Sequence, residues 1–423
     1  MGTRFSREPL IIEDKDILRD NWQPEELIER EEELDMYTSA LTPIVRGWQP
    51  NNIFLYGVTG SGKTVATRQL ITELLDECKN YDDVNLNVVD MNCKSLNSSY
   101  QVAVNLVNEM RDPSYQLTTL DLDKPQISET GHPQQQVFDE LYDDIETVGG
   151  TVLFVLDEID NIGTSDDILY ELPRAKSTYN LDAKIGVIGI SNDFKFRDNL
   201  SPKVKDTLCE EEIMFSPYNA NELQQILRQR AQKAFIDEKY LEQEVIPLCA
   251  AFAAQDSGSA RQALRLLRKS ADIAEDKLRK DKRSERMVTE TDVREGEIDI
   301  HRQQVIEGID SLTKHGHLVL LTVCELASEQ KTPSRTKEIH RRYKSVANDF
   351  GAKQLKRRRV HDHLSDLELH GVLEKRSTTA GRGNYNQYEL DVQISSVLEV
   401  MEDRFDEDSI SPIRAKAQMH DII

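Results

Sequence analysis

The chain has 423 residues, enough for two or three domains of ordinary size, and its 38% hydrophobic and 30% charged content is that of a globular protein rather than a disordered one. Its formal net charge of −23 normally argues against a nucleic-acid partner, because the protein's own field repels phosphate. Such acidity is also typical of proteins that stay soluble in molar salt, where charge is strongly screened, and we favour this explanation over an ordinary acidic cytosolic protein.

The same composition argues against membrane and secreted classes. No run of roughly 18 apolar residues predicts a transmembrane helix, and Met1–Glu8 lacks the apolar segment of a secretory signal. The five cysteines are scattered without Cys-x-x-Cys spacing, so we expect reduced thiols in a cytoplasmic protein and no zinc site.

The first predicted element is a helix in the acidic segment 22–34. Pro24 is suited to the first turn of a helix, and the glutamates that follow it are favourable near a helix N-terminus. A solvated acidic helix accounts for these charges by itself.

A phosphate-binding P-loop follows at 57–64, which reads Gly-Val-Thr-Gly-Ser-Gly-Lys-Thr. The apolar run 52–56 predicts a buried strand before it, and apolar residues at helical spacing in 65–78 predict a helix after it. Glycines let backbone N–H groups surround a phosphate, and the helix N-terminus adds partial positive charge. We therefore predict that the loop binds a nucleotide, with Lys63 at its β- and γ-phosphates and Thr64 as a ligand of its Mg²⁺. The predicted binding loop consists of Val58, Thr59, Gly60, Ser61, Gly62, Lys63 and Thr64.

Further strands and helices alternate after the P-loop, which predicts a parallel α/β sheet. The strand at 151–156 ends in Asp157 and Glu158, a pair suited to hold Mg²⁺ and to polarise a water. Asn192 follows the strand 184–191 and either faces the ligand, where it would sense the γ-phosphate or position the water, or simply forms a turn. The other predicted elements are a strand at 84–91, helices at 99–110 and 135–147, and a loop at 111–134.

After Phe215 the pattern contains helices only. We predict them at 220–234, with Asn221 as N-cap, at about 245–254, and from 258 onward. Arg261 falls in the first turn of the last helix, where a cation opposes the helix dipole, and this conflict indicates a role such as phosphate binding. The charged segment 277–286 is predicted to be a connector between domains.

The C-terminal block reverses the charge of the chain. Residues 331–391 contain fourteen lysines and arginines against eight acids, a net charge of +6, so the rest of the chain carries −29. A local basic surface of this kind is typical of nucleic-acid binding.

The order of elements in this block predicts a winged helix-turn-helix. Helices are expected around 318–326, at 334–348 with Ser334 as cap, and at 353–369, followed by strands at 372–376 and 385–390. The third helix buries Val360, Leu364 and Leu367, which leaves Gln354, His361 and Ser365 on its outer face, as in a recognition helix. The predicted DNA contacts are Arg357, Arg358, Arg359 and, at the tip of the wing, Arg382.

Together, these motifs resemble those of archaeal initiators of the origin-recognition and cell-division-control family of AAA+ ATPases, over about residues 15–400. Residues 57–64 match its Walker A motif, 156–160 its Walker B motif, and Asn192 its sensor 1. The resemblance implies that Pro24 and Leu27–Arg30 lie on the adenine side, that Tyr218 and Arg230 lie near the nucleotide, and that Arg261 is sensor 2. The helix at about 99–127 resembles the initiator-specific insertion that touches DNA.

The chain departs from the family at several places. Lys203 stands where an arginine finger is expected, and lysine lacks the guanidinium fork, which puts trans-activation of a neighbouring ATP in doubt. Ser259 replaces a common Asp, and the acidic insert 120–144 is atypical. With the acidity of the chain, these departures suggest one paralogue among several in a haloarchaeon.

The resemblance implies the following architecture: an AAA+ α/β domain at 1–215 with the insertion at 99–127, an all-α lid at 216–300, a winged-helix domain at 301–400 and a C-terminal tail at 401–423. It also implies a slow ATPase switch with ATP and Mg²⁺ as cofactors, in which Glu158, Asn192 and Arg261 are catalytic and Thr64 and Asp157 hold the metal. The expected partners are double-stranded origin DNA in the nucleoid, the replicative helicase and other initiator paralogues, with no membrane.

Two other functions remain open from the sequence. One is a remodelling or clamp-loading AAA+ motor that uses the basic domain as a tether. The other is a winged-helix transcription regulator with a vestigial ATPase domain. Lys203 argues against the motor, and the intact Lys63, Asp157 and Glu158 argue against a vestigial site.

Overall fold

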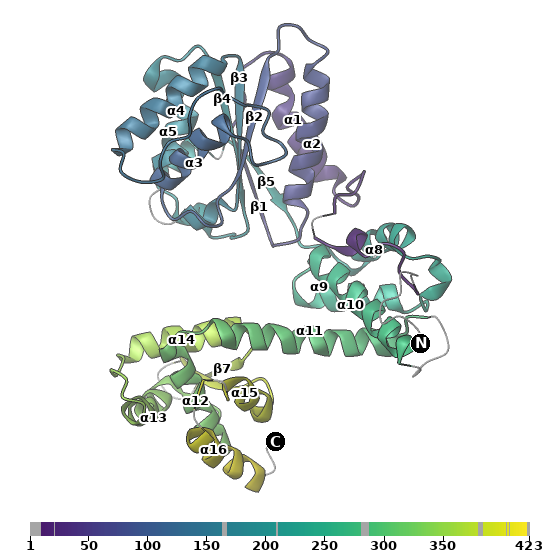
Figure 1. The fold of residues 1–423 in the computed structure, drawn as a ribbon, viewed down its shortest axis with the longest axis vertical. Coiled ribbons are helices and arrows are strands. Elements are labelled where there is room, and N and C mark those ends of the chain that lie inside the picture. Colours follow the sequence, from purple (N-terminus) through teal and green to yellow (C-terminus); the bar gives the residue numbers. More distant parts are fainter. Residues whose placement is uncertain are drawn as a thin grey trace. The chain divides into compact units, whose positions relative to one another are not determined.

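A computed structural model of the chain divides into two compact units, Met1–Arg294 and Glu295–Ile423, and the division lies within helix α11 (Glu290–Ser311) (Figure 1). Among the described residues, none of the helices combines the length and the apolar character needed to cross a bilayer. The structure describes residues 10–20, 22–162, 167–208, 210–280, 287–379, 384–402, 404–405 and 407–420.

The first unit contains a five-stranded parallel sheet with the order β2-β3-β4-β1-β5. The strand that leads into the P-loop is thus next to the strand that precedes Asn192, and the strand that ends at Asp157 lies on the other side of that second strand. Since parallel strands end at the same edge of a sheet, the P-loop, Asp157 and Asn192 lie at one edge. The strands are β1 (Ile53–Gly57), β2 (Leu86–Asn92), β3 (Thr151–Asp157), β4 (Lys184–Ser191) and β5 (Glu211–Phe215).

Helices cover both faces of this sheet (Figure 1). Alternate strand residues point to opposite faces, so Phe54 and Phe154 pack into one core while Leu55 and Val155 pack into the other. One face is covered by α1 (Glu31–Val45) and α2 (Lys63–Cys78), and the other by α3 (Ser99–Arg111), α4 (Gln134–Val148), α5 (Asp167–Tyr179) and α7 (Pro202–Leu208).

This arrangement confirms the predicted α/β fold class and corrects two details. Strand β5 was not predicted, because its pattern is mostly polar and only Ile213 and Phe215 are buried. The first helix begins at Glu31 rather than at Pro24. Residues before it serve tertiary contacts instead: the Leu27 N–H donates to the Gln69 side chain, and Glu29 has a left-handed φ of 61° that a helix does not allow.

The segment about 99–127 contains one helix that ends at Arg111, followed by loop. The apolar side of this helix is fully buried in the core that packs against the sheet, through Val102, Leu106, Val107 and Met110. In the loop, Thr118 and Thr119 bond to the backbone of the edge strand β2 at 3.0 and 2.9 Å. Contact of this segment with DNA stays a prediction.

Helices α8 (Ala220–Ala234), α9 (Val245–Asp256) and α10 (Ala260–Arg279) complete the first unit. The N-cap of α8 is Asn219 rather than the predicted Asn221. Its side chain accepts from the N–H groups of Asn221 and Glu222, and the Glu222 side chain accepts from the Asn219 N–H, so the two form a capping box.

The first described residues run across these helices before they reach the sheet domain. We call residues 10–20 and 22–30 the N-terminal arm. The buried Glu275 of α10 accepts the N–H groups of Ile11 and Ile12 at 3.2 and 3.3 Å, and the Glu13 N–H donates to the Ala234 carbonyl at 2.9 Å. The arm is therefore an integral part of the helical layer and not a loose end.

The second unit has the predicted winged-helix order. A three-stranded antiparallel sheet, β6-β8-β7, packs with the helices of the unit around a core that includes Val360, Leu364, Leu367 and Tyr388. The elements are α12 (Lys314–Ser328), β6 (Ser334–Arg335), α13 (Thr336–Asp349), α14 (Arg357–Leu369), β7 (Leu373–Thr379), β8 (Asn384–Leu390), α15 (Ile394–Met401) and α16 (Glu407–Met419).

Three details of this unit differ from the prediction. Ser334 belongs to β6, and the N-cap of α13 is Arg335. Helix α14 begins at Arg357 rather than at Lys353, so Gln354 lies in the preceding loop, where its amide donates to Asn348 at 2.8 Å. The segment expected to be a tail contains α16, whose Ile410 and Ile413 are buried in the core of the unit.

Candidate nucleotide site and nucleic-acid interface

The P-loop lies between β1 and α2, and Lys63 is folded back onto it. The Lys63 ammonium donates to the carbonyls of Gly57 and Val58, both at 2.9 Å, and the side chain is 4% exposed. Burial lowers the pKa of Lys63 to about 8, although the carboxylates of Asp157 and Asp160 act in the opposite direction. The ammonium also donates to the Ser61 hydroxyl at 3.4 Å, and a buried cation held by such neutral oxygens is well suited to meet a phosphate.

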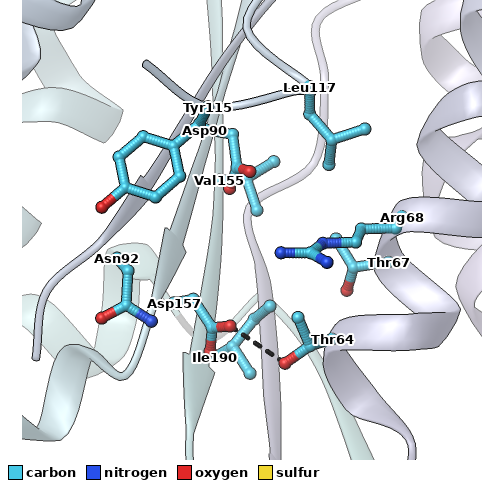
Figure 2. A pocket seen from close by; sticks show the side chains of 10 residues that line it. All are labelled: Thr64, Thr67, Arg68, Asp90, Asn92, Tyr115, Leu117, Val155, Asp157 and Ile190. Atoms are coloured by element: carbon cyan, nitrogen blue, oxygen red, sulfur yellow. Dashed lines mark hydrogen bonds between the residues drawn. The ribbon is translucent and has the colours of Figure 1, made fainter. Parts of the chain in front are cut away.

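Thr64 and Asp157 meet as predicted (Figure 2). The Thr64 hydroxyl donates to the Asp157 carboxylate at 2.9 Å, and the Glu158 N–H donates to the other carboxylate oxygen at 2.8 Å. Burial raises the pKa of Asp157. A hydroxyl beside a carboxylate is the donor set that Mg²⁺ prefers, so the two residues fit this ion.

Glu158 and Asn192 lie at the same edge of the sheet. Glu158 has a left-handed φ of 55°, and its carboxylate accepts from the Asn92 amide at 3.4 Å. The Asn192 N–H donates to Asp160 at 3.1 Å, which links the end of β4 to the turn after β3. Glu158 and Asn192 thus follow two adjacent strands at the edge where Thr64 meets Asp157, and their role in positioning a water stays a prediction.

The lid touches the P-loop directly. The Ala260 N–H at the start of α10 donates to the Gly60 carbonyl at 3.1 Å. Both Gly60 and Gly62 have left-handed φ, and a Cβ on Gly60 would lie 2.2 Å from the Ser259 hydroxyl. A Cβ on Gly62 would lie 2.9 Å from the hydroxyl of Tyr218. These glycines are therefore required by lid contact as well as by phosphate approach.

A cavity of about 90 Å³ opens between the lid, the N-terminal arm and the P-loop. Arg230 lines it, 7% exposed, with its guanidinium 4.0 Å from the Trp22 ring centroid. Burial lowers the pKa of Arg230 to about 10. Among the described residues no acceptor pairs with its Nε, and a buried cation without such a partner favours a polar or anionic ligand. The cavity is also lined by Pro24, Leu27, Val65, Tyr218, Ile226 and Arg261.

Arg261 lies in the first turn of α10, as predicted, and faces this cavity. Its Nε is 3.1 Å from the carboxylate of Asp20 in the N-terminal arm. The sequence does not reveal this pairing, because 240 residues separate the two side chains along the chain.

Arg30 belongs to this site, although the sequence predicted it only as part of the segment Leu27–Arg30. It is 4% exposed, donates from Nε to the Ser61 carbonyl at 3.0 Å, and also donates to the Ser216 carbonyl. Its guanidinium lies 3.7 Å from the centroid of the Tyr218 ring. One arginine therefore joins the arm, the P-loop and the entry to the lid.

A second cavity, of about 70 Å³, is lined by Thr64 and Asp157 beside the P-loop (Figure 2). Arg68 enters it from α2, one turn after Thr64, and faces Asp90 on β2. Burial raises the pKa of Asp90 to about 6, against the opposing effect of Arg68. The spacing from Thr64 to Arg68 was the available signal for this residue, because residues four apart share a helix face.

The residue at the expected arginine-finger position, Lys203, lies on α7. Its ammonium is 5.8 Å from the Tyr170 ring centroid, and the guanidinium of Arg174 is 5.1 Å from the same ring. Tyr170 therefore holds two cations on this surface of the sheet domain.

In the winged-helix unit, Arg357, Arg358 and Arg359 form the first turn of α14 and are exposed. His361, predicted to lie on the outer face, instead meets the Tyr388 hydroxyl at 3.2 Å. Arg382 lies outside the described residues. The sequence did not predict the contact between Arg335 and Tyr385, in which the guanidinium lies 4.6 Å from the ring centroid.

Comparison with known families finds three successive matches. An AAA domain model matches residues 48–193, the Cdc6 AAA+ ATPase-type lid domain matches 224–297, and the CDC6 C-terminal winged helix domain matches 307–400.

Similar proteins cover nearly the whole chain. ORC1-type DNA replication protein 15 of Haloarcula marismortui is 48% identical over 95% of this chain and 94% of its own length. ORC1-type DNA replication protein 10 of Halobacterium salinarum is 48% identical over 94% of each chain. Among solved structures, the ORC1 protein of Aeropyrum pernix in complex with DNA is 31% identical, has a TM-score of 0.78, and covers 94% of this chain and 98% of that one.

Identity at this level over almost the full length, together with the AAA, lid and winged-helix matches in the expected order, confirms the resemblance predicted from the motifs. The chain therefore belongs to the family of ORC1-type DNA replication proteins, the replication initiators that combine an AAA+ domain, a Cdc6-type lid and a C-terminal winged helix.

Proposed function

We propose that this protein binds ATP with Mg²⁺ between its sheet domain and lid and uses the nucleotide as a switch for binding origin DNA. The observation that carries the proposal is the direct contact of the lid with the P-loop, through Ala260 and Gly60 and through Tyr218 and Gly62. A ligand in the P-loop must alter this contact, so the nucleotide can govern the position of the lid.

The roles of the residues follow from their surroundings. Lys63 and Arg261 bind phosphate oxygens, and Thr64 and Asp157 hold Mg²⁺, which would supply positive charge to the β- and γ-phosphates. The apolar residues of the lid-side cavity accept the base, while Arg230 offers it or the ribose a buried donor. The backbone of Val58, Thr59 and Ser61 completes the phosphate cradle.

Hydrolysis is proposed to be slow. Glu158 and Asn192 orient the attacking water, because both lie at the carboxyl edge of the sheet beside Asp157. A neighbouring subunit's cation would come from Lys203, which presents a point charge and not a fork. A nucleotide switch tolerates lysine at the arginine-finger position better than a motor does.

Origin DNA is the proposed polymer partner. The exposed arginines at the start of α14 lie where a helix N-terminus favours anions, and they belong to the block with net charge +6. Arg382 is proposed to extend this contact from the wing, and the loop after α3 to add a second. Recruitment of the replicative helicase, association with other initiator paralogues and a place in the nucleoid are part of the same proposal.

Footprinting of the protein on genomic DNA, with and without ATP, tests the proposal. We expect protection of repeated elements at a replication origin, with a pattern that depends on ATP in the wild type and not in K63A. An absence of sequence-specific protection would refute the origin function. Protection confined to the promoter of the protein's own gene would support the transcription-regulator alternative.

A further inference from the structure

The lid arginine that faces the nucleotide cavity already has an anionic partner. Arg261 Nε is 3.1 Å from Asp20 Oδ2, and the two side chains are 53% and 54% exposed. Both residues line the same cavity as Gly60 and Gly62 of the P-loop. A carboxylate thus lies at the mouth of a site built for phosphates.

The N-terminal arm fixes the position of this carboxylate from both sides. Before Asp20, Lys15 pairs with Asp272 and with the buried Glu275 of α10, at 2.5 and 3.0 Å. After Asp20, the Trp22 ring stacks on Arg230. Asp20 therefore lies between a contact of the arm with α10 and a contact of the arm with α8.

We infer that Asp20 is a positioning residue for Arg261 and a competitor of the nucleotide's phosphates for that guanidinium. The inference rests on the proposed role of Arg261 in phosphate binding. Because the Arg261 Nε is engaged by Asp20, a phosphate that recruits this arginine must either share it or displace the carboxylate. Nucleotide binding then weakens the charge contact between the arm and the lid, and the arm lowers nucleotide affinity in return, as linkage requires.

The size of the effect follows from the exposure of the pair. Half-exposed ion pairs are weak, so removal of the Asp20 charge should tighten nucleotide binding by about two- to fivefold. The gain should shrink as the salt concentration rises, because the pair is open to solvent and the Debye length falls to about 3 Å in 1 M salt.

The test is the dissociation constant of a fluorescent ATP analogue for the full-length protein at low salt. D20N should bind the analogue about two- to fivefold more tightly than the wild type, and D20E, which keeps the carboxylate, should bind like the wild type. E25Q is the matched control, because Glu25 lies in the same arm and pairs with Lys233 at 3.0 Å, and neither residue lines the cavity. No gain in D20N, or an equal gain in E25Q, would overturn the inference.

A double-mutant cycle with R261Q separates competition from simple repulsion between Asp20 and the phosphates. If Asp20 acts through Arg261, D20N has no effect in the R261Q background. An equal gain in both backgrounds would mean direct repulsion and would overturn the inference. Binding by the wild type as weak as that by K63A would instead refute the proposed nucleotide site itself.

Discussion

Three buried cations surround the nucleotide site of this strongly acidic chain. Lys63, Arg30 and Arg230 are 4%, 4% and 7% exposed. Arg30 pairs with the carboxylate of Glu33 at 2.8 Å. Lys63 is held by oxygens of the P-loop, and Arg230 by the Trp22 ring and the Ile17 carbonyl. Burial of charge is costly unless it is compensated, so the two less compensated cations point to a ligand that supplies negative charge.

At the same scale, Glu158 is expected to control hydrolysis and not binding. E158Q keeps the size of the side chain and its bond to Asn92 but removes the carboxylate that would polarise a water. We expect kcat for ATP hydrolysis to fall by about 10²- to 10⁴-fold, with an unchanged dissociation constant for ATP. Phosphate release and equilibrium binding, measured on the same preparation, check this.

The control for that experiment is E211Q, which changes an exposed glutamate of β5. It should behave like the wild type in both assays. A normal hydrolysis rate in E158Q would show that Glu158 does not act on the water.

At the scale of elements, one glutamate joins three helices of the winged-helix unit. Glu329 follows the end of α12, and its carboxylate meets Lys331 at 2.7 Å, Lys416 of α16 at 3.1 Å, and Arg342 of α13. The pKa of Glu329 is lowered to about 2, and the hydrogen bond from Lys331 is the largest cause. The C-terminal helix is thus tied to the helix-turn-helix by charge as well as by its apolar face.

This pairing predicts a pH-dependent stability. Because the folded pKa of Glu329 is below its ordinary value of 4.5, its stabilising contribution is present above about pH 4.5 and is lost as the pH falls toward 2. We expect E329Q to unfold at a lower denaturant concentration than the wild type at pH 7, with a difference that shrinks in acid. E399Q, which removes an exposed pair with Arg302, should match the wild type throughout. A constant difference at every pH would contradict the assignment.

The apolar face of α16 predicts a larger loss. Ile413 is 3% exposed and packs into the core of the unit, so I413A should lower the free energy of unfolding by about 2–5 kcal/mol. M419A removes a side chain of the same helix that is 83% exposed and should change it by less than about 0.5 kcal/mol. Chemical denaturation of both variants measures the difference. Equal stabilities would show that α16 does not support the fold.

At the scale of the whole molecule, the charge is divided unequally. The block 331–391 carries +6 while the rest of the chain carries −29. Phosphate contacts weaken steeply as salt rises, so a DNA-binding protein that works in concentrated salt must depend more on bases and DNA shape.

We therefore predict that neutralising Arg357, Arg358 and Arg359 to glutamine changes specificity as well as affinity. A competition assay between origin and random DNA, repeated over a salt series, measures both. The dependence of log affinity on log salt should become shallower by about 0.9 for each lost phosphate contact, and the preference for origin DNA should fall. R302Q, an exposed arginine of α11, is the control. Equal weakening on all sequences would contradict the prediction.

Local patterns were sufficient for most of the fold. The alternation of apolar strands and helices predicted four of the five strands of the sheet domain and the helices α2, α3 and α4, but not α5 or α7. The P-loop, Asp157 and Asn192 were recognised from their places at strand ends. Strand β5 was missed because edge pairing, not an apolar pattern, makes it a strand. The start of α1 was wrong because Leu27 and Arg30 are used for contacts with α2 and the P-loop, which local helix propensity does not report.

The sequence by itself therefore determined the class of the protein and the chemistry of its P-loop, because these depend on residue types within short segments. Only the tertiary structure decided which charges meet. Asp20 with Arg261, Arg30 with Ser61 and Tyr218, and Glu329 with Lys416 are pairs whose members come from distant parts of the chain. Such pairs form only when packing of the helices and the arm brings the side chains within hydrogen-bond distance, and the spacing of residues along the chain carries no record of that packing.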